Sequence, residues 1–266
     1  MSISPGLCSI TFRSLTTDEV LQAALRAGVE GIEWGADAHV AVGGGPAVDA
    51  LRARCRDAGI EIVSYGSYLG FGPPEEDETG TIDAVLDSAE ALGAPMVRIW
   101  TELGVSPTSP ADDRHRVTDR TAQFADAIAA LGLIAALEFH PYTLTETAVS
   151  ANELLTTLAR PNLRTHWQPD PALPIDAALS ELGQVTQHLA HVHTFFWGAS
   201  GIDDRHALAD GADLWPPAFE LADREGASLP GRRFALCEYV RDDDPDQLVV
   251  DVDVLREWLR AIPGSF

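Results

Sequence analysis

A carboxylate and an imidazole stand together at the end of one apolar segment. The stretch "IAALEFH" covers residues 134–140, and its polar side chains are Glu138 and His140. In an extended chain alternate side chains share a face, so these two point the same way. An unpaired carboxylate at the end of a buried strand costs several kcal/mol, at order of magnitude. We therefore expect this segment to end in a polar pocket that other parts of the chain help to form.

Further apolar segments carry polar residues that could share this pocket. They are Glu33 in residues 31–35, Gln168 in residues 163–169, His191 and His193 in residues 191–197, and Glu238 in residues 233–240. Two buried carboxylates that lie close together raise each other's pKa unless a cation sits between them. A divalent ion would remove this repulsion. Oxygen ligands with one imidazole suit Mn²⁺ best, with Co²⁺, Mg²⁺ and Zn²⁺ as alternatives. We predict one metal ion with four ligands: Glu138, Gln168, His193 and Glu238.

Strand-like and helix-like segments alternate along the whole chain. The eight expected strands cover residues 7–13, 31–35, 61–67, 96–100, 134–140, 163–169, 191–197 and 233–240. Helical patterns include residues 16–28, 47–59, 81–93, 119–132 and 244–262. This alternation indicates a parallel sheet with right-handed crossovers, and eight units match an α/β protein with a (β/α)8 TIM barrel. We predict a single barrel domain over residues 1–266. An open doubly wound sheet is the alternative, but no glycine fingerprint follows the first strand.

The carboxyl ends of the strands build the active site of such a barrel. Closure of the barrel would therefore bring the four predicted metal ligands together. Other polar side chains near this end are candidates for binding substrate hydroxyl groups, namely Glu33, Arg98, His140 and Arg205. Trp100 could pack against a sugar ring, or it could fill the barrel as an ordinary core residue.

Several of these stretches resemble a known group of proteins. "LEFHPYTLTET", "HVHTFFW", "RHALADGADLW" and "FALCEYV" are similar to segments of the xylose isomerase-like superfamily of sugar isomerases and epimerases, which includes the sugar phosphate isomerase/epimerase family. The resemblance spans essentially all eight units. It implies metal ligands at Glu138, His193 and Glu238, and it implies that the two glutamates exchange protons with a bound sugar.

The sixth expected strand departs from the family pattern. Family members usually show an aspartate followed three residues later by a histidine, whereas this chain has Gln168 and Pro171 in those places. An amide oxygen still coordinates a metal but brings no charge, so the site would carry two negative charges instead of three. Asp170 shares the strand parity of Gln168 and is the alternative ligand, although prolines bracket it.

The residues and the resemblance together predict a metal-dependent sugar isomerase or epimerase. Such an enzyme removes a proton next to a ketone, and the metal stabilises the enediolate that forms. Glu138 and Glu238 are the expected proton-transfer pair. A lyase that dehydrates a keto-polyol or a 3-keto-glycoside would start with the same step, so it is the first alternative. A non-catalytic sugar-binding barrel is the second.

Composition limits the partners of this chain. Its 266 residues include 41 acidic and 18 basic residues, for a formal net charge of −23, so nucleic-acid binding is disfavoured. All 18 basic residues are arginine, which excludes a lysine Schiff base and a P-loop. We expect no membrane span and no signal peptide, and we expect a cytoplasmic protein with reduced cysteines. The expected partner is a small sugar or a cyclic keto-polyol, and a homodimer is one alternative for the assembly.

Overall fold

The eight strands form one closed parallel barrel in the order β1 to β8. The computed structural model describes residues 3–74, 79–198 and 200–262, so the two limits of the predicted domain, residues 1 and 266, lie outside the described residues. The strands are β1 (Ile3–Cys8), β2 (Gly31–Gly35), β3 (Glu61–Gly66), β4 (Met96–Ile99), β5 (Ile134–Glu138), β6 (Leu163–Trp167), β7 (Leu189–Thr194) and β8 (Arg233–Cys237). The predicted (β/α)8 barrel is confirmed, because β1 also pairs in parallel with β8.

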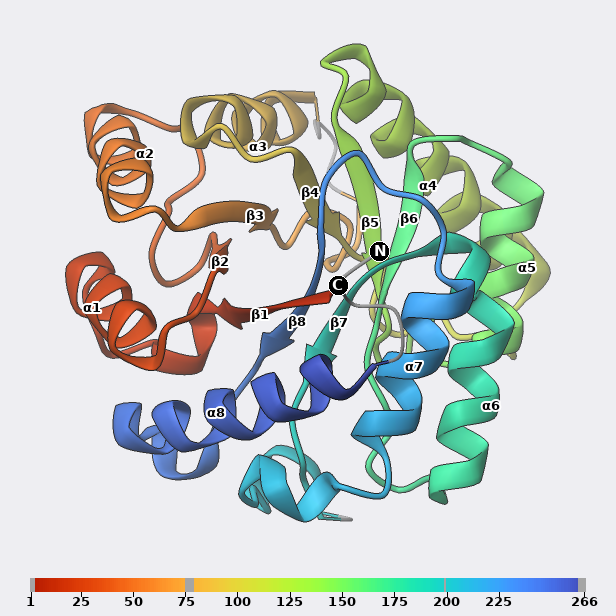
Figure 1. Ribbon diagram of the computed structural model, residues 1–266. Coiled ribbons are helices and arrows are strands. Elements are labelled where there is room, and N and C mark those ends of the chain that lie inside the picture. Colours follow the sequence, from red (N-terminus) through yellow and green to blue (C-terminus); the bar gives the residue numbers. More distant parts are fainter. Residues whose placement is uncertain (1–2, 75–78, 199, 263–266) are drawn as a thin grey trace.

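Helices surround this barrel (Figure 1), with α1, α2 and α3 on one side and α5 and α6 on the other. Their bounds are α1 (Thr17–Ala27), α2 (Pro46–Ala58), α3 (Thr79–Leu92), α4 (Ala111–Ala130), α5 (Ala148–Leu158), α6 (Ile175–Val185), α7 (Trp215–Glu225) and α8 (Pro245–Ala261). Short 3-10 turns occur at Ser9–Phe12, Thr186–His188, Gly201–Asp203, Leu208–Gly211 and Arg241–Asp243. None of the helices in the described ranges is long and apolar enough to cross a membrane.

Local sequence explains where helices begin and end. Thr16 caps α1 by accepting the amide hydrogen of Glu19, while the Glu19 carboxylate accepts the amide hydrogen of Thr16. This reciprocal arrangement satisfies two of the free donors at a helix start. Gly28 ends α1 with φ 68°, a left-handed conformation that favours glycine.

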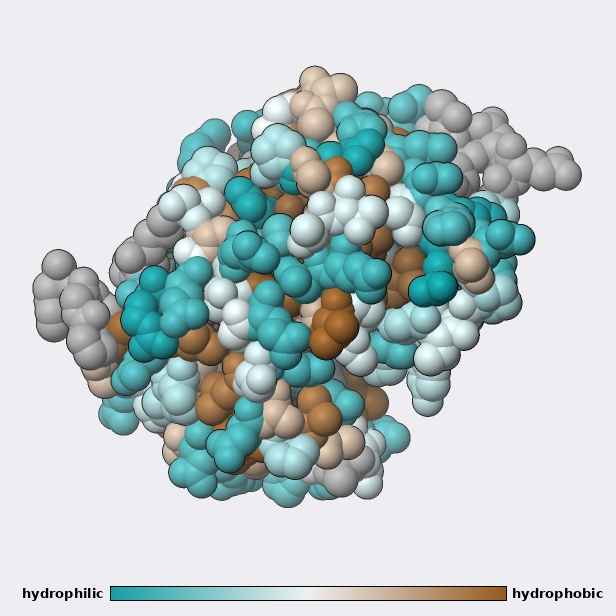
Figure 2. All heavy atoms as spheres, turned by 90° about the vertical axis from the view of Figure 1, so that its right-hand side faces the viewer, coloured by the Kyte–Doolittle hydropathy of each residue, from teal (hydrophilic) through white to brown (hydrophobic). Residues whose placement is uncertain are grey.

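The apolar faces of the helices then pack on the strands, and the surface in Figure 2 shows hydrophilic side chains with apolar residues in small groups between them.

The prediction for the first strand was wrong in its position. We expected residues 7–13, whereas β1 covers Ile3–Cys8 and residues Ser9–Phe12 form a 3-10 turn. Pro5 and Gly6 normally disfavour a strand interior, but here Gly6 is needed for packing. A Cβ atom at Gly6 would lie 2.5 Å from Cδ2 of Leu236 and 3.2 Å from the carbonyl oxygen of Gly31. The neighbouring strands thus approach β1 closely at the residue that looks like a strand breaker.

We predict that Gly6→Ala destabilises the barrel by about 1–3 kcal/mol, because the added methyl group overpacks the contact with β8. The matched control is Gly80→Ala in α3, where a Cβ atom would meet no atom within 4 Å. That variant should leave the free energy of unfolding unchanged or raise it by up to about 1 kcal/mol. Urea unfolding followed by circular dichroism measures both. Equal stability of the two variants would show that β1 and β8 do not pack this tightly.

Candidate active site

Consecutive strands bring four polar side chains together at the carboxyl end of the barrel. Glu138 ends β5, Gln168 follows β6, His193 lies in β7, and Glu238 follows β8. Nδ1 of His193 lies 3.2 Å from Oε1 of Gln168, 3.4 Å from Oε1 of Glu138 and 3.5 Å from Oε2 of Glu238. Each ligand atom of Glu138, His193 and Glu238 lies within 4.8 Å of the others. We call these four residues the strand-end cluster.

The structure distinguishes the two alternatives for strand six. The Gln168 side chain donates a 2.7 Å hydrogen bond from Nε2 to the carbonyl oxygen of Phe139, which leaves its Oε1 facing His193. Asp170 is exposed, and its Oδ1 accepts the amide hydrogen of Ala172 at 2.9 Å. It is therefore Gln168, and not Asp170, that lies beside His193 in the strand-end cluster.

Arg98 and Glu33 lie behind this cluster and form an ion-pair network with it. The Arg98 guanidinium donates from Nε to Oε1 of Glu33 at 2.7 Å and from Nη1 to Oε2 of Glu138. Both side chains of the Arg98–Glu33 pair are at most 2% exposed. Ser64 donates its hydroxyl hydrogen to Glu33 as well, and Nε2 of His193 lies 3.7 Å from Oε1 of Glu33. Glu33, which we expected to contact substrate, is thus surrounded by protein groups.

Burial and neighbouring charges set the protonation of these acids. Burial alone would raise the pKa of Glu33 and of Glu138, but the charge of Arg98, together with His193, outweighs burial and lowers both pKa values. Burial raises the pKa of Glu238 to about 7, against the attraction of His193. Burial would also lower the pKa of the His193 imidazole, yet the neighbouring Cys8, Glu238 and Glu138 raise that pKa well above its ordinary value. The carboxylates of the cluster therefore stabilise a positively charged group that lies between them.

These residues fit a divalent metal ion. The strand-end cluster offers two carboxylates, one amide oxygen and one imidazole nitrogen, which is a ligand set suited to hard or borderline divalent cations. Nε2 of His193 is buried and has no hydrogen-bond partner among the described residues. It lies 3.7 Å from Oε1 of Glu33, in the place where a supporting carboxylate commonly orients a metal-binding histidine.

Two other buried histidines fill the barrel beneath the cluster. Burial lowers the pKa of His166 on β6 to about 3, and its Nδ1 lies 3.6 Å from Oε2 of Glu33. His191 is also held neutral by burial, and its Nδ1 accepts the amide hydrogen of Phe234 at 3.2 Å. His166 was not among the predicted site residues, although it shares the strand parity of Gln168. Both histidines belong to the packed interior of the barrel.

Aromatic rings form one wall of the mouth above the cluster. Trp100 stacks against Tyr68 with centroids 5.6 Å apart, and the centroids of Phe71 and His140 lie 4.1 Å and 4.3 Å from that of Trp100. Trp100 is 8% exposed, and its indole Nε1 is buried and unpartnered within the described ranges. Trp100 and His140 thus lie against each other in this wall, and their role in substrate binding stays a prediction. Tyr68 and Phe71 were not among the predicted site residues, although both aromatic residues follow β3 closely in the sequence.

Two further arginines, Arg205 and Arg13, are held in ion pairs with acidic residues. Arg205 pairs with Asp243, and its guanidinium carbon lies 5.1 Å from the ring centroid of Tyr239. Arg13 pairs with Asp37 and donates from Nη2 to the hydroxyl oxygen of Tyr68 at 2.9 Å. We predicted a substrate-binding role for Arg205, and the structure places its charge in this ion pair. Arg13 was missed because its partners lie far along the chain.

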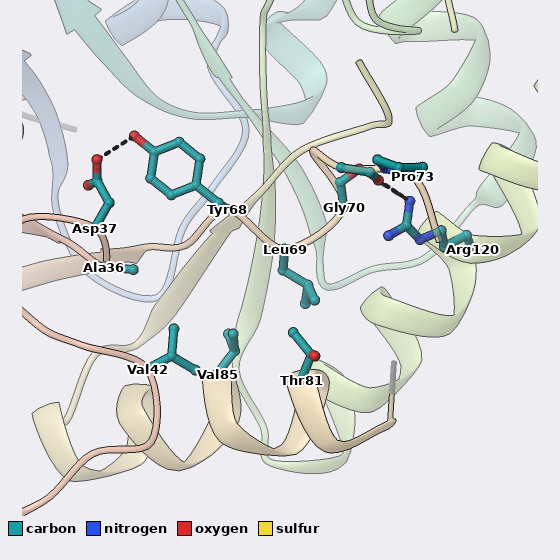
Figure 3. A pocket seen from close by; sticks show the side chains of 11 residues that line it. Ala36, Asp37, Val42, Tyr68, Leu69, Gly70, Pro73, Thr81, Val85 and Arg120 are labelled. Carbon is teal, nitrogen blue, oxygen red and sulfur yellow. Dashed lines mark hydrogen bonds between the residues drawn. The ribbon is translucent and has the colours of Figure 1, made fainter. Parts of the chain in front are cut away.

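Two cavities of similar size adjoin the mouth, and only one of them reaches the cluster. The cavity between the β5, β6 and β7 loops has a volume of about 360 Å³ and is lined by Gln168 and His140 among others. Figure 3 shows the other cavity, of about 310 Å³, which is lined by Tyr68, Leu69 and Val85 and by no residue of the cluster. Two of its polar side chains are paired with each other, since the Tyr68 hydroxyl donates to Asp37 at 3.0 Å. We therefore place the candidate active site at the cluster and the first cavity.

The fold and this site define a TIM-barrel protein with a candidate metal site at the carboxyl ends of strands β5 to β8. Residues 21–259 match the family model described as a xylose isomerase-like TIM barrel. The chain therefore belongs to the xylose isomerase-like TIM-barrel family, as its resemblance to that group implied.

Relatives in this family have different activities. A 3-dehydroshikimate dehydratase of Bacillus anthracis is 27% identical over 217 residues, which are 76% of this chain and 74% of the relative. The crystal structure of a probable 3-DHS dehydratase from the same organism has a TM-score of 0.78 at 17% identity, covering 96% of this chain and 99% of that one.

Two further solved structures share the fold. A xylose isomerase-like protein of Mycobacterium smegmatis in complex with magnesium has a TM-score of 0.73 at 13% identity, with 97% of each chain covered. A D-allulose 3-epimerase of Methylomonas sp. has a TM-score of 0.70 at 14% identity, covering 97% of this chain and 98% of that one. The family thus includes both dehydratases and epimerases.

We predict that Arg98→Met destabilises the protein by about 3–5 kcal/mol, because it leaves two carboxylates buried without their cation. Adding Glu33→Gln to this variant should restore part of the loss. The control is Arg160→Met, which removes a partly exposed pair with Asp126 and should cost at most about 1 kcal/mol. Urea unfolding in the presence of a chelator measures all three. A loss for Arg98→Met no larger than the control would contradict the network described above.

Proposed function

We propose that this protein is a metal-dependent enzyme that removes a proton next to the carbonyl group of a keto-sugar or a keto-polyol. The strand-end cluster would hold the ion through Glu138, Gln168, His193 and Glu238. The observation that carries the proposal is their convergence on Nδ1 of one buried histidine, at 3.2–3.5 Å. When bound, the ion would polarise the carbonyl oxygen and stabilise the negative charge that develops on it.

The two glutamates differ in the groups that surround them. Arg98 holds one oxygen of Glu138, and the other oxygen faces His193. Glu238 has no arginine partner within the described parts of the chain, and its contact is with His193. We therefore assign proton removal from the substrate to Glu238, since its second oxygen is the less engaged of the two. Glu138 then acts mainly as a ligand and as the link to Arg98.

This asymmetry favours elimination over epimerisation. An epimerase needs groups that reach both faces of the reacting carbon, whereas a dehydratase needs one base and a donor for the departing hydroxyl group. With Glu138 held by Arg98, one free carboxylate remains. Glu238 would take the proton from carbon and then return it to the departing hydroxyl group, which leaves as water, so one carboxylate serves both steps. The 27% identical relative, a 3-dehydroshikimate dehydratase, supports the same choice. Isomerisation or epimerisation is the second candidate, supported by the D-allulose 3-epimerase that shares the fold.

Metal binding should depend on each cluster residue. Loss of a residue that only supports a metal ligand typically weakens metal affinity by about 10–100-fold. Alanine at Glu138, His193 or Glu238 should weaken the affinity for Mn²⁺ by more than this, because each would remove a ligand itself. Gln168→Leu should weaken binding, Gln168→Asp should strengthen it by adding a negative charge, and Asp170→Asn should leave it unchanged. Calorimetric titration of chelator-treated protein measures these affinities. If Asp170→Asn weakens binding while Gln168→Leu does not, Asp170 is the ligand on strand six.

The reaction itself has a direct test. Turnover of a panel of keto-sugars, keto-cyclitols and 3-keto-glycosides in D₂O should give deuterium at the carbon next to the carbonyl group, or an unsaturated ketone that absorbs in the ultraviolet. Glu238→Gln should lower kcat by about 10²–10⁴-fold, the usual contribution of a positioned acid–base group. Turnover without exchange or elimination would indicate hydride transfer and would refute the proposal.

A further inference from the structure

The cavity beside Gln168 provides room that a single reacting sugar ring at the cluster does not use. It opens between the loops that follow β5, β6 and β7, and Glu138, His193 and Glu238 do not line it. Its volume of about 360 Å³ falls in the range of about 300–1,000 Å³ that is typical of small-molecule sites. A molecule that reacts at the cluster could therefore extend sideways into this cavity, past Gln168 and His140.

Aromatic side chains give this cavity a surface for stacking. The rings of Phe195 and Trp197 both line it and are themselves stacked, with centroids 3.8 Å apart and an interplanar angle of 17°. Trp197 is half-buried, and its Nε1 is buried without a hydrogen-bond partner in the described part of the chain. The part of the indole that lines the cavity therefore suits contact with the apolar face of a ligand ring.

Three carboxylates in the same cavity offer acceptors to hydroxyl groups. Each is anchored by one backbone amide: Glu146 by that of Tyr142 at 2.9 Å, Asp170 by that of Ala172 at 2.9 Å, and Glu181 by that of Ala148 at 3.4 Å. A carboxylate has two oxygens and several acceptor positions, so each keeps capacity for a ligand hydroxyl group.

The charges around this cavity disfavour an anionic ligand. Its described lining includes no arginine, and the chain has no lysine. The arginines at the mouth are engaged: Arg13 pairs with Asp37, Arg98 with two glutamates, and Arg205 with Asp243. A carboxylate or phosphate group in the cavity would thus meet three negative side chains and no available cation.

We propose that this cavity is a subsite for a second, uncharged, hydroxyl-bearing ring, so that the substrate is a neutral glycoside or a similar two-ring keto compound. This inference rests on the proposed function, because the first ring is assigned to the strand-end cluster. It adds to that function by stating which part of the substrate lies next to the reacting ring. It also distinguishes this chain from an enzyme whose substrate carries a carboxylate.

Binding of unreactive probes to the Mn²⁺-loaded protein tests the subsite by itself. Calorimetry should show that phenyl β-glucoside binds about tenfold more tightly than methyl β-glucoside, in line with one added aromatic contact. Trp197→Ala should remove this gain and leave both the affinity for methyl β-glucoside and the affinity for Mn²⁺ unchanged. Val42→Ala, in the cavity of Figure 3, is the control and should change none of the three affinities.

A matched pair of probes tests the charge. 4-Carboxyphenyl β-glucoside, which carries a carboxylate on the second ring, should bind at least about tenfold more weakly than phenyl β-glucoside. Asp170→Arg changes an exposed residue of the cavity and should raise the affinity for the carboxyphenyl glucoside. The subsite proposal is overturned if the carboxyphenyl glucoside binds the unaltered protein as tightly as phenyl β-glucoside or if the cationic 4-(aminomethyl)phenyl β-glucoside binds more tightly than either. It is also overturned if Trp197→Ala weakens the binding of methyl β-glucoside as much as that of phenyl β-glucoside.

The two proposals can fail separately. Deuterium exchange with a single-ring substrate, without any preference for the phenyl probe, would remove the subsite and keep the proposed function. Selective binding of the phenyl probe by a protein that catalyses no exchange with any ketone of the panel would remove the enzymatic function and keep the second-ring site.

Discussion

The double ion pair of Arg98 is the interaction on which the candidate site depends. A guanidinium that is 1% exposed lies between Glu33 and Glu138, which come from two other strands. Removing either charge would leave the other buried without compensation, at a cost of several kcal/mol. The pair also links the second, fourth and fifth strands at one level of the barrel. Closure of the barrel therefore helps to fix where the Glu138 carboxylate lies relative to His193.

Space for this pair comes from a glycine. A Cβ atom at Gly66, the last residue of β3, would lie 2.6 Å from Nη2 of Arg98 and 3.0 Å from Oε1 of Glu33. Any larger residue would displace the guanidinium or the carboxylate. The barrel can therefore be closely packed and still hold buried charges, because Gly66 on β3 has no side chain and leaves room for the long side chain of Arg98 on β4.

The sequence predicted the parts of this arrangement that depend on strand order. Glu138, Gln168, His193 and Glu238 follow the rule that carboxyl ends of successive barrel strands meet, so their convergence needed only a correct count of strands. The choice between Gln168 and Asp170 needed the path of the chain after β6, where prolines make strand parity a poor guide. Which acid each arginine pairs with could not be predicted either. Arg13 and Tyr239 are 226 residues apart in the chain and in hydrogen-bond contact.

The ion pair gives a physical reason for a neutral residue at strand six. In the proposed site, Glu33, Glu138 and Glu238 would contribute three negative charges, and Arg98 with a divalent ion would contribute three positive charges, if His193 coordinates in its neutral form. An aspartate in place of Gln168 would add a fourth negative charge to a site from which water is largely excluded, and that charge would have no partner. The extra charge would hold the ion more strongly but would oppose the negative charge that develops on a reacting substrate. The neutral amide at this position therefore leaves the three carboxylates matched by Arg98 and the ion.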